Sequence, residues 1–159
     1  MSRLAASLAV VLLCAGCGFQ LQGAVTIPDA MEQTWIDTGD RKSLFYREFR
    51  RALLDAGVEL VDSPADATAI FSIYYDATDQ RVLSVSARNV PTEYEVFYTI
   101  EYGLVSGDQT LIQRQDMTLT RDYTYDPTLV LGKAAEEQVI RESLVNDLVR
   151  IVLKQISAQ

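Results

Sequence analysis

The chain has 159 residues, of which 14 are Lys or Arg and 22 are Asp or Glu, so its formal net charge at pH 7 is −8. This acidic balance argues against a nucleic-acid-binding protein, because phosphate backbones reward clustered Lys and Arg. The sequence has no His and only two Cys, which removes the commonest general base and leaves too few ligands for a zinc site. We therefore expect no metal site and no nucleic-acid partner.

The N-terminus has the features of a targeting segment. Arg3 provides a positive charge, Leu4 to Leu13 form an apolar run, and the small residues Ala15 and Gly16 precede Cys17. The apolar run is too short to cross a bilayer as a helix, which needs roughly 20 residues. The position of Cys14 and Cys17 behind this run also disfavours a redox pair, which belongs at a helix start in a folded domain.

The segment resembles a bacterial lipoprotein signal, in which the cysteine becomes the first mature residue and carries acyl chains. An ordinary secretory signal or an uncleaved anchor remains the alternative. The resemblance predicts that residues 1–16 are cleaved and that residues 17–159 form a single domain lipidated at Cys17. The residue after Cys17 is Gly18. In bacterial lipoproteins Asp at this position causes retention at the inner membrane, so the resemblance implies delivery to the outer membrane. The acyl groups on Cys17 are the only cofactor-like groups that we expect.

Two amphipathic helices are predicted, one near each end of the mature chain. The first covers about Lys42 to Ala56, with Phe45, Phe49, Ala52 and Leu53 on one face at helical spacing, and Gly57 ends it. The second starts near Asp126 and runs to about Ile156. Its apolar stripe consists of Ile140, Leu144, Leu148 and Ile151, widened by Val145, Val152 and Ile156.

The middle of the chain is predicted to be a β-sheet. Four strands are expected from apolar and alternating patterns, at residues 67–75, 81–87, 92–104 and 110–125. Short strands are expected at residues 34–36 and 58–61. Short connections between the four main strands indicate an antiparallel meander. The predicted fold is therefore α+β, a two-layer sandwich in which two helices pack on one face of a four-stranded antiparallel sheet that has room for short edge strands.

No catalytic residues are predicted. Glu93, Glu95 and Glu101 share a strand face, and paired carboxylates are sufficient for a glycosidase. Charged residues that alternate along a strand are more often its solvated side, however, and the chain lacks the usual nucleophile and base pairs. We therefore do not expect an enzyme.

Three stretches carry a resemblance to a known family. They are CGFQLQG at the mature start, SARNVPTEYEVFYTIEY in the centre, and RDYTYDPTLVLGKAAEEQVIRESLVNDLVR near the end. Together they resemble LptE, the lipopolysaccharide-assembly lipoprotein family. The chain departs from the family's opening motif at Gln22, where a basic residue is frequent.

The resemblance implies a partner and a location. Family members act as a plug and scaffold inside the β-barrel of LptD, and the two proteins place lipopolysaccharide in the outer leaflet. The protein is therefore expected at the outer membrane, lipid-anchored, on the periplasmic side and in the barrel lumen. A generic outer-membrane lipoprotein is the alternative, and a carboxylate-based cell-wall hydrolase is a more distant one.

Two cations are predicted to bind lipopolysaccharide. An acidic protein can contact anionic lipid A only through surface that is locally free of carboxylates, and residues 80–92 and 127–135 qualify. In the family, a basic residue beside the central hairpin and another at the head of the last helix are implicated in this contact. Arg88, expected on the polar side of its strand, and Lys133 match those positions. The alternative is that both are ordinary surface residues.

Overall fold

The computed structural model describes residues 26–125 and 130–159, with residues 130–134 described by their backbone alone. The predicted signal peptide, Cys17 and Gln22 lie outside these residues. The elements are, in chain order, η1 (Asp29–Met31), β1 (Gln33–Thr38), α2 (Leu44–Asp55), β2 (Glu59–Leu60), η2 (Pro64–Asp66), β3 (Ala69–Val85), β4 (Pro91–Ser106), β5 (Gln109–Thr124) and α3 (Val130–Ile156).

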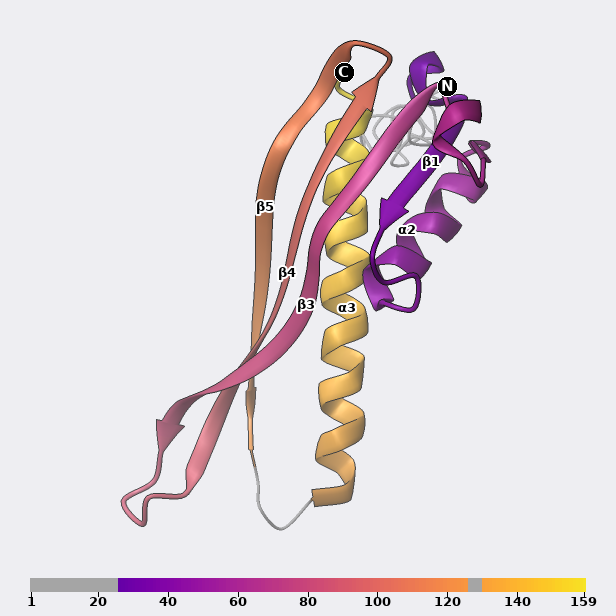
Figure 1. Ribbon diagram of the computed structural model, residues 1–159. Helices are drawn as coiled ribbons and strands as arrows, with labels where there is room; N and C mark the ends of the chain where they lie inside the picture. Colours follow the sequence, from indigo (N-terminus) through magenta and orange to yellow (C-terminus); the bar gives the residue numbers. More distant parts are fainter. Residues whose placement is uncertain (1–25, 126–129) are drawn as a thin grey trace, which may run out of the picture.

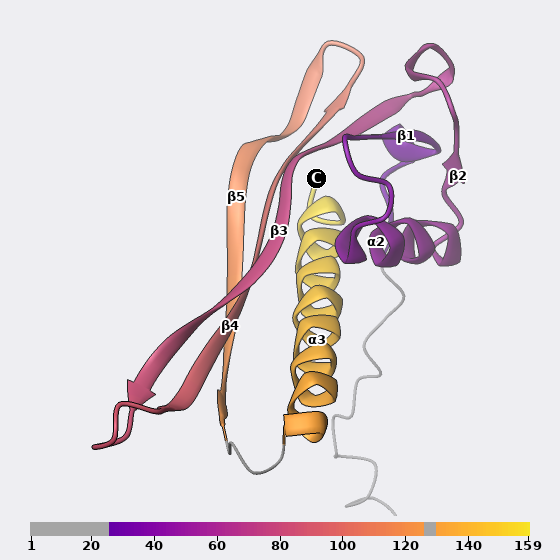
Figure 2. The same cartoon turned by 60° about the horizontal axis from the view of Figure 1, so that its bottom comes forward.

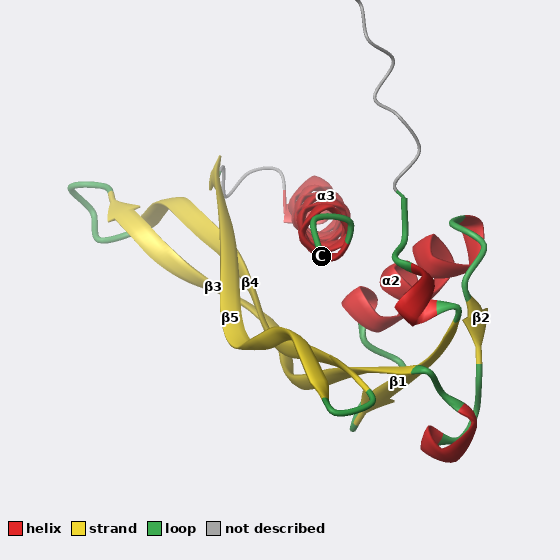
Figure 3. Cartoon of the chain, turned by 90° about the horizontal axis from the view of Figure 1, so that it is seen from above, coloured by secondary structure: helices red, strands yellow, loops and turns green. Residues whose placement is uncertain are grey.

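The sheet is five-stranded, open and mixed, with strand order β2-β1-β3-β4-β5. Both helices cover the same face of it, as Figure 3 shows in a view along α3. The predicted two-layer α+β architecture with two helices on one face is therefore confirmed. The prediction of a four-stranded antiparallel sheet is wrong in detail, because β1 runs parallel to both β2 and β3. A parallel neighbour requires a crossover connection, and α2 lies in that connection.

The two strands predicted at residues 67–75 and 81–87 are one long strand, β3. Residues 76–80 are mostly polar, a composition typical of a connection between strands. Hydrogen bonds to residues distant in sequence keep most of their polar side chains paired within the strand. The Asp76 carboxylate accepts a hydrogen bond from the Tyr98 hydroxyl at 2.6 Å, and the Thr78 hydroxyl donates to the carbonyl of Phe97 at 2.8 Å. A bulge between Ile73 and Tyr75 turns Asp76 toward the helices, because it opposes Ile100 on the inner face.

The two predicted helices are confirmed within a few residues. Ser43 caps α2 by accepting a hydrogen bond from the backbone N–H of Tyr46 at 3.1 Å, and Gly57 follows the helix at φ +87°, a conformation that favours glycine. Among the side chains of α3 that the structure describes, from residue 135 onward, the buried ones all lie in the C-terminal half of the helix. They are Leu144, Val145, Leu148, Val149, Val152, Leu153 and Ile156.

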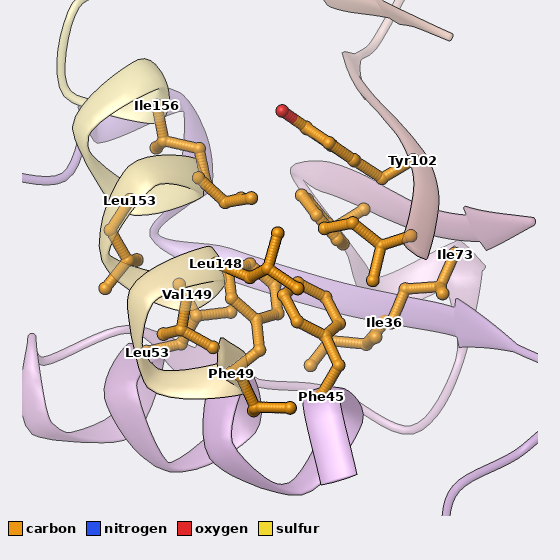
Figure 4. Close-up of a cluster of buried hydrophobic side chains, with 14 of the residues drawn as sticks. Ile36, Phe45, Phe49, Leu53, Ile73, Tyr102, Leu148, Val149, Leu153 and Ile156 are labelled. Atoms are coloured by element: carbon orange, nitrogen blue, oxygen red, sulfur yellow. The ribbon is translucent and has the colours of Figure 1, made fainter. Parts of the chain in front are cut away.

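The core lies between the two helices and the upper half of the sheet in Figure 1. Figure 4 shows Phe45, Phe49 and Leu53 of α2 meeting Val149 and Leu153 of α3. A row of aromatic rings extends this contact into the sheet. Phe49 packs on Phe71 with ring centroids 4.3 Å apart, and Phe71 stacks on Tyr102 at 5.6 Å.

A polar network fastens the start of α2 to the sheet beside this core. The Tyr98 hydroxyl donates to Asp76 and also accepts the backbone N–H of Phe45 at 3.2 Å, while the Ser43 hydroxyl donates to the same carboxylate. Burial, together with the bond to Asp76, raises the pKa of Tyr98, so its hydroxyl remains a hydrogen-bond donor at neutral pH. The network satisfies an N–H of the first turn of the helix that would otherwise have no partner.

We expect Tyr98→Phe to lower the free energy of unfolding by about 1–3 kcal/mol, because it removes two buried hydrogen bonds and leaves an N–H of α2 unpaired. Urea unfolding followed by circular dichroism measures this change. Tyr74→Phe is the matched control, because Tyr74 is half exposed. Removing the hydroxyl of Tyr74 should change the free energy of unfolding by about 0.5 kcal/mol or less. Equal effects of the two substitutions would contradict a stabilising role for the network.

Candidate functional site

The β3–β4 hairpin extends away from the core and ends in a five-residue turn, residues 86–90 (Figures 1 and 2). The N–H of Ser86 donates to the carbonyl of Val90 at 2.8 Å, and the N–H of Asn89 donates to the carbonyl of Ser86 at 2.9 Å. Asn89 has φ 60°, in the left-handed region that Asn tolerates better than most residues. These bonds give the tip of the hairpin a defined shape.

Large apolar side chains are exposed along this hairpin. They are Val82, Leu83, Val85 and Val90, and Val85 reaches 54% exposure. The strand predicted at residues 81–87 ends at Val85, and register shifts on both sides of Ser84 interrupt its pairing with β4. Such a group of exposed aliphatic residues is typical of a surface that meets an apolar partner.

Arg88 lies in the turn rather than on the strand, contrary to the sequence-based expectation, because β3 ends at Val85. Its side chain is exposed, and it forms no ion pair with any residue of the described parts of the chain. Residues 80–92 around it contain no Asp or Glu. The Arg88 guanidinium is therefore available to an anionic ligand.

Lys133 belongs to the first turn of α3, and its side chain lies outside the described residues. Antiparallel pairing of Glu93 with Thr124 places the end of β5 beside the base of the hairpin tip, and α3 follows after a short connection. The hairpin turn and the start of α3 thus lie at the same end of the molecule, although the hairpin bends away from the helix (Figures 1 and 2).

The three glutamates of β4 lie on the face of the sheet opposite the helices, and each has a partner. Arg114 donates two hydrogen bonds to Glu101, at 2.6 and 2.9 Å, and these bonds hold the pKa of Glu101 below its usual range. Glu95 pairs with Arg81, and Glu93 accepts a hydrogen bond from Ser84 at 2.8 Å. Arg114 keeps Glu101 ionised, whereas a glycosidase acid needs a raised pKa. This arrangement fits a solvated strand face.

Across residues 26–125 and 130–159, no three His, Cys, Asp or Glu side chains are grouped so that they could hold a metal ion. In the same described residues, neither helix has a stretch that is long and apolar enough to cross a membrane.

The family model described as "LptE: Lipopolysaccharide-assembly" matches residues 24–156, most of the chain. The chain belongs to the LptE family. The role of this family in lipopolysaccharide assembly is non-enzymatic, in agreement with the expectation from the sequence that the chain is not an enzyme.

Two relatives named LPS-assembly lipoprotein LptE illustrate the similarity. The protein of Pectobacterium atrosepticum is 30% identical over 142 residues, which cover 84% of this chain and 73% of that protein. The protein of Yersinia enterocolitica is 25% identical over 153 residues, which cover 92% of this chain and 70% of that protein.

Solved structures of lipoproteins share the fold. The solution structure of lipoprotein B from Nitrosomonas europaea has a TM-score of 0.73 and 26% identity, and the match covers 89% of this chain and 91% of that one. The crystal structure of rare lipoprotein B from Shewanella oneidensis has a TM-score of 0.70 at 21% identity, covering 79% and 94%. This member of the LptE family therefore has the fold of known lipoproteins.

Sequence reasoning found the acid-free hairpin and Arg88 but missed the exposed aliphatic residues on both sides of it. A signal for them is present in the sequence, since residues 80–92 combine several Val and Leu residues with an absence of carboxylates. Their exposure depends on how far the hairpin extends beyond the helices, and local sequence does not contain that information.

Proposed function

We propose that this protein is the lipid-anchored plug and scaffold subunit of an LptD-type β-barrel in the outer membrane, and that it helps to place lipopolysaccharide in the outer leaflet. The observation that carries this proposal is the family match over residues 24–156. In the proposal, residues 1–16 are a cleaved signal and Cys17 carries the acyl chains, so that the domain of residues 17–159 acts from the periplasmic side and within the barrel lumen.

The β3–β4 hairpin supports a contact with lipopolysaccharide. Its tip presents Arg88, which has no ion pair with any residue that the structure describes, and the exposed Val85 and Val90 lie beside the cation. Lipopolysaccharide combines phosphates with acyl chains, so a ligand of this class meets both features. Charge-assisted hydrogen bonds to phosphate contribute about 1.5–3 kcal/mol each when they are partly desolvated.

A tagged copy of the protein, extracted in mild detergent, should copurify with a large β-barrel protein at a near-equal amount. We expect this because a plug within a barrel buries a large apolar and aromatic interface. Mass spectrometry and densitometry of the eluate measure it, with a tagged unrelated outer-membrane lipoprotein as the control. If no barrel protein is recovered, the chain is better described as a generic outer-membrane lipoprotein.

The double substitution Arg88→Asp with Lys133→Asp should weaken binding of purified lipopolysaccharide by about tenfold or more, because two charge-assisted contacts become repulsive. Barrel copurification and thermal stability should remain near those of the unmodified protein. Each single substitution is compared with Lys154→Asp, which makes the same charge change at an exposed cation in the last turn of α3.

Two outcomes of that experiment would change the assignment. If lipopolysaccharide binding is unchanged, Arg88 and Lys133 are ordinary surface residues. If barrel copurification is lost while the protein remains folded, the two cations belong to the protein interface instead.

Cys17→Ser should abolish incorporation of a radioactive fatty acid, because it removes the thiol that forms the thioether to the lipid. Cys14→Ser should leave the label unchanged, because Cys14 would be discarded with the signal. Gel fluorography of the immunoprecipitated protein measures both. Label that persists in Cys17→Ser and disappears in Cys14→Ser would place the cleavage site before Cys14.

A further inference from the structure

Helix α2 presents a row of cations on the side facing away from the core. Arg47, Arg50, Arg51 and Leu54 are spaced i, i+3, i+4 and i+7, so they form one continuous stripe on the helix surface. All four are exposed, Leu54 at 44%. The opposite side of the helix is buried through Phe45, Phe49 and Leu53. We call the four exposed residues the arginine stripe.

The arginine stripe belongs to the most basic segment of an acidic chain. Residues 41–51 contain five of the 14 Lys and Arg and one of the 22 Asp and Glu, which leaves nine basic and 21 acidic residues for the rest of the sequence. Positive charge is therefore concentrated on α2 and the turn before it. A protein that needed these residues only for solubility would have no reason to gather them, since its net charge is already far from zero.

Most of these cations are also free of internal partners. Among the described residues, Arg41, Lys42, Arg47 and Arg50 form no ion pair, and Arg51 pairs only with Glu48 of its own helix. Most described cations elsewhere are paired, namely Arg81, Arg114, Arg121, Arg141 and Arg150. The surface charge of α2 is thus left for an external anion.

The carboxylates outside α2 that line hollows beside it form no ion pair with its arginines in the described structure. Glu142 of α3 shares a hollow of about 310 Å³ with Arg47 and Arg51, but it accepts a hydrogen bond from Gln138 at 2.8 Å and pairs with neither arginine. Asp62 lies near Arg41 and Arg50 in the same way, without an ion pair to either in the described structure.

The position of α2 relative to the start of the described chain gives the stripe a location. Residues 26–29, Met31 and Glu32 line a hollow of about 460 Å³ together with Ala56, Gly57 and Val58, which directly follow α2. The chain therefore enters the fold beside the end of α2 that carries Leu54. Nine residue steps separate Cys17 from Thr26 and span at most about 30 Å when extended. A domain anchored at Cys17 would hold α2, about 18 Å long, within reach of the bilayer surface.

We propose that the arginine stripe docks on the anionic phospholipid headgroups of the membrane that holds the anchor. This inference rests on the lipidation of Cys17 in the proposed function. Basic helical surfaces are attracted to anionic leaflets, and an apolar residue among the cations enters the headgroup region, which gives Leu54 a role. Docking would orient the domain on the membrane. The β3–β4 hairpin extends away from α2 (Figure 1), so it would point away from the docked helix.

The test uses the mature acylated protein with Leu54→Cys, labelled with an environment-sensitive nitrobenzoxadiazole fluorophore. Since Cys17 would be acylated and Cys14 removed, the new thiol is the single labelling site. The protein is incorporated into vesicles of phosphatidylethanolamine with either phosphatidylglycerol or phosphatidylcholine, each containing a lipid-attached nitroxide quencher. Val139→Cys, at an exposed position of α3, is the matched control.

We expect about twofold stronger quenching of the Leu54→Cys label in the phosphatidylglycerol vesicles, and no such difference for Val139→Cys. Adding Arg47→Gln, Arg50→Gln and Arg51→Gln, or raising the salt concentration to about 1 M, should abolish the difference. Equal quenching in both vesicles, or quenching that survives the three Gln substitutions, would overturn the proposal. A Leu54→Cys label that is never quenched would also overturn it and would favour an acidic protein partner for the stripe.

Vesicle flotation separates failure of the anchor from failure of this inference. If the acylated protein floats with the vesicles while the Leu54→Cys label shows no lipid-dependent quenching, lipidation stands and the docking of α2 is wrong. If the protein does not float, the lipidation on which the inference rests is itself wrong. The same conclusion follows if the Cys17→Ser variant floats as well as the protein that retains Cys17.

Discussion

The structure depends on one aromatic row that crosses both layers of the fold. Phe45 and Phe49 of α2, Phe71 of β3 and Tyr102 of β4 contact one another in this order, and the Tyr102 hydroxyl donates a hydrogen bond to Gln155 of α3. Each of these four side chains is fully buried. Burying one such ring contributes about 1.5–3 kcal/mol, and the row connects both helices to the neighbouring strands β3 and β4. The remaining elements are arranged around it.

Because the row lies toward one end of the sheet, the other end is left with less cover. The buried side chains among residues 135–156 of α3 lie in its C-terminal half, and β3 has none beyond Ile73. The distal hairpin therefore keeps exposed aliphatic residues that a helix would otherwise bury. The same asymmetry creates a stable half that holds the fold together and an extended half that is suited to contact a partner or a lipid.

Charge is distributed with a similar division of roles. On the outer face of the sheet, arginines pair with glutamates, as Arg114 does with Glu101, and leave little net positive charge. On α2 and at the hairpin turn, cations such as Arg47 and Arg88 have no ion pair within the described residues. Exposed ion pairs contribute little to stability, so the paired arginines add little to folding, whereas the unpaired cations remain available to external anions.

The sequence by itself determined the family, the two helices, the strongest strand and the short strands at residues 34–36 and 58–61. Local periodicity suffices for these, as in the strand predicted at residues 92–104, which is part of β4 and in which Val96, Tyr98, Ile100 and Tyr102 alternate into the core. It also located Arg88 and the acid-free hairpin of the candidate site. Only the tertiary structure decided that β1 runs parallel to its neighbours, that residues 76–80 continue β3, and that Arg88 lies in a turn. The physical reason is that each depends on a distant partner: Asp76 stays inside a strand because Tyr98 and Ser43 satisfy its carboxylate, and neither of them is near it in sequence.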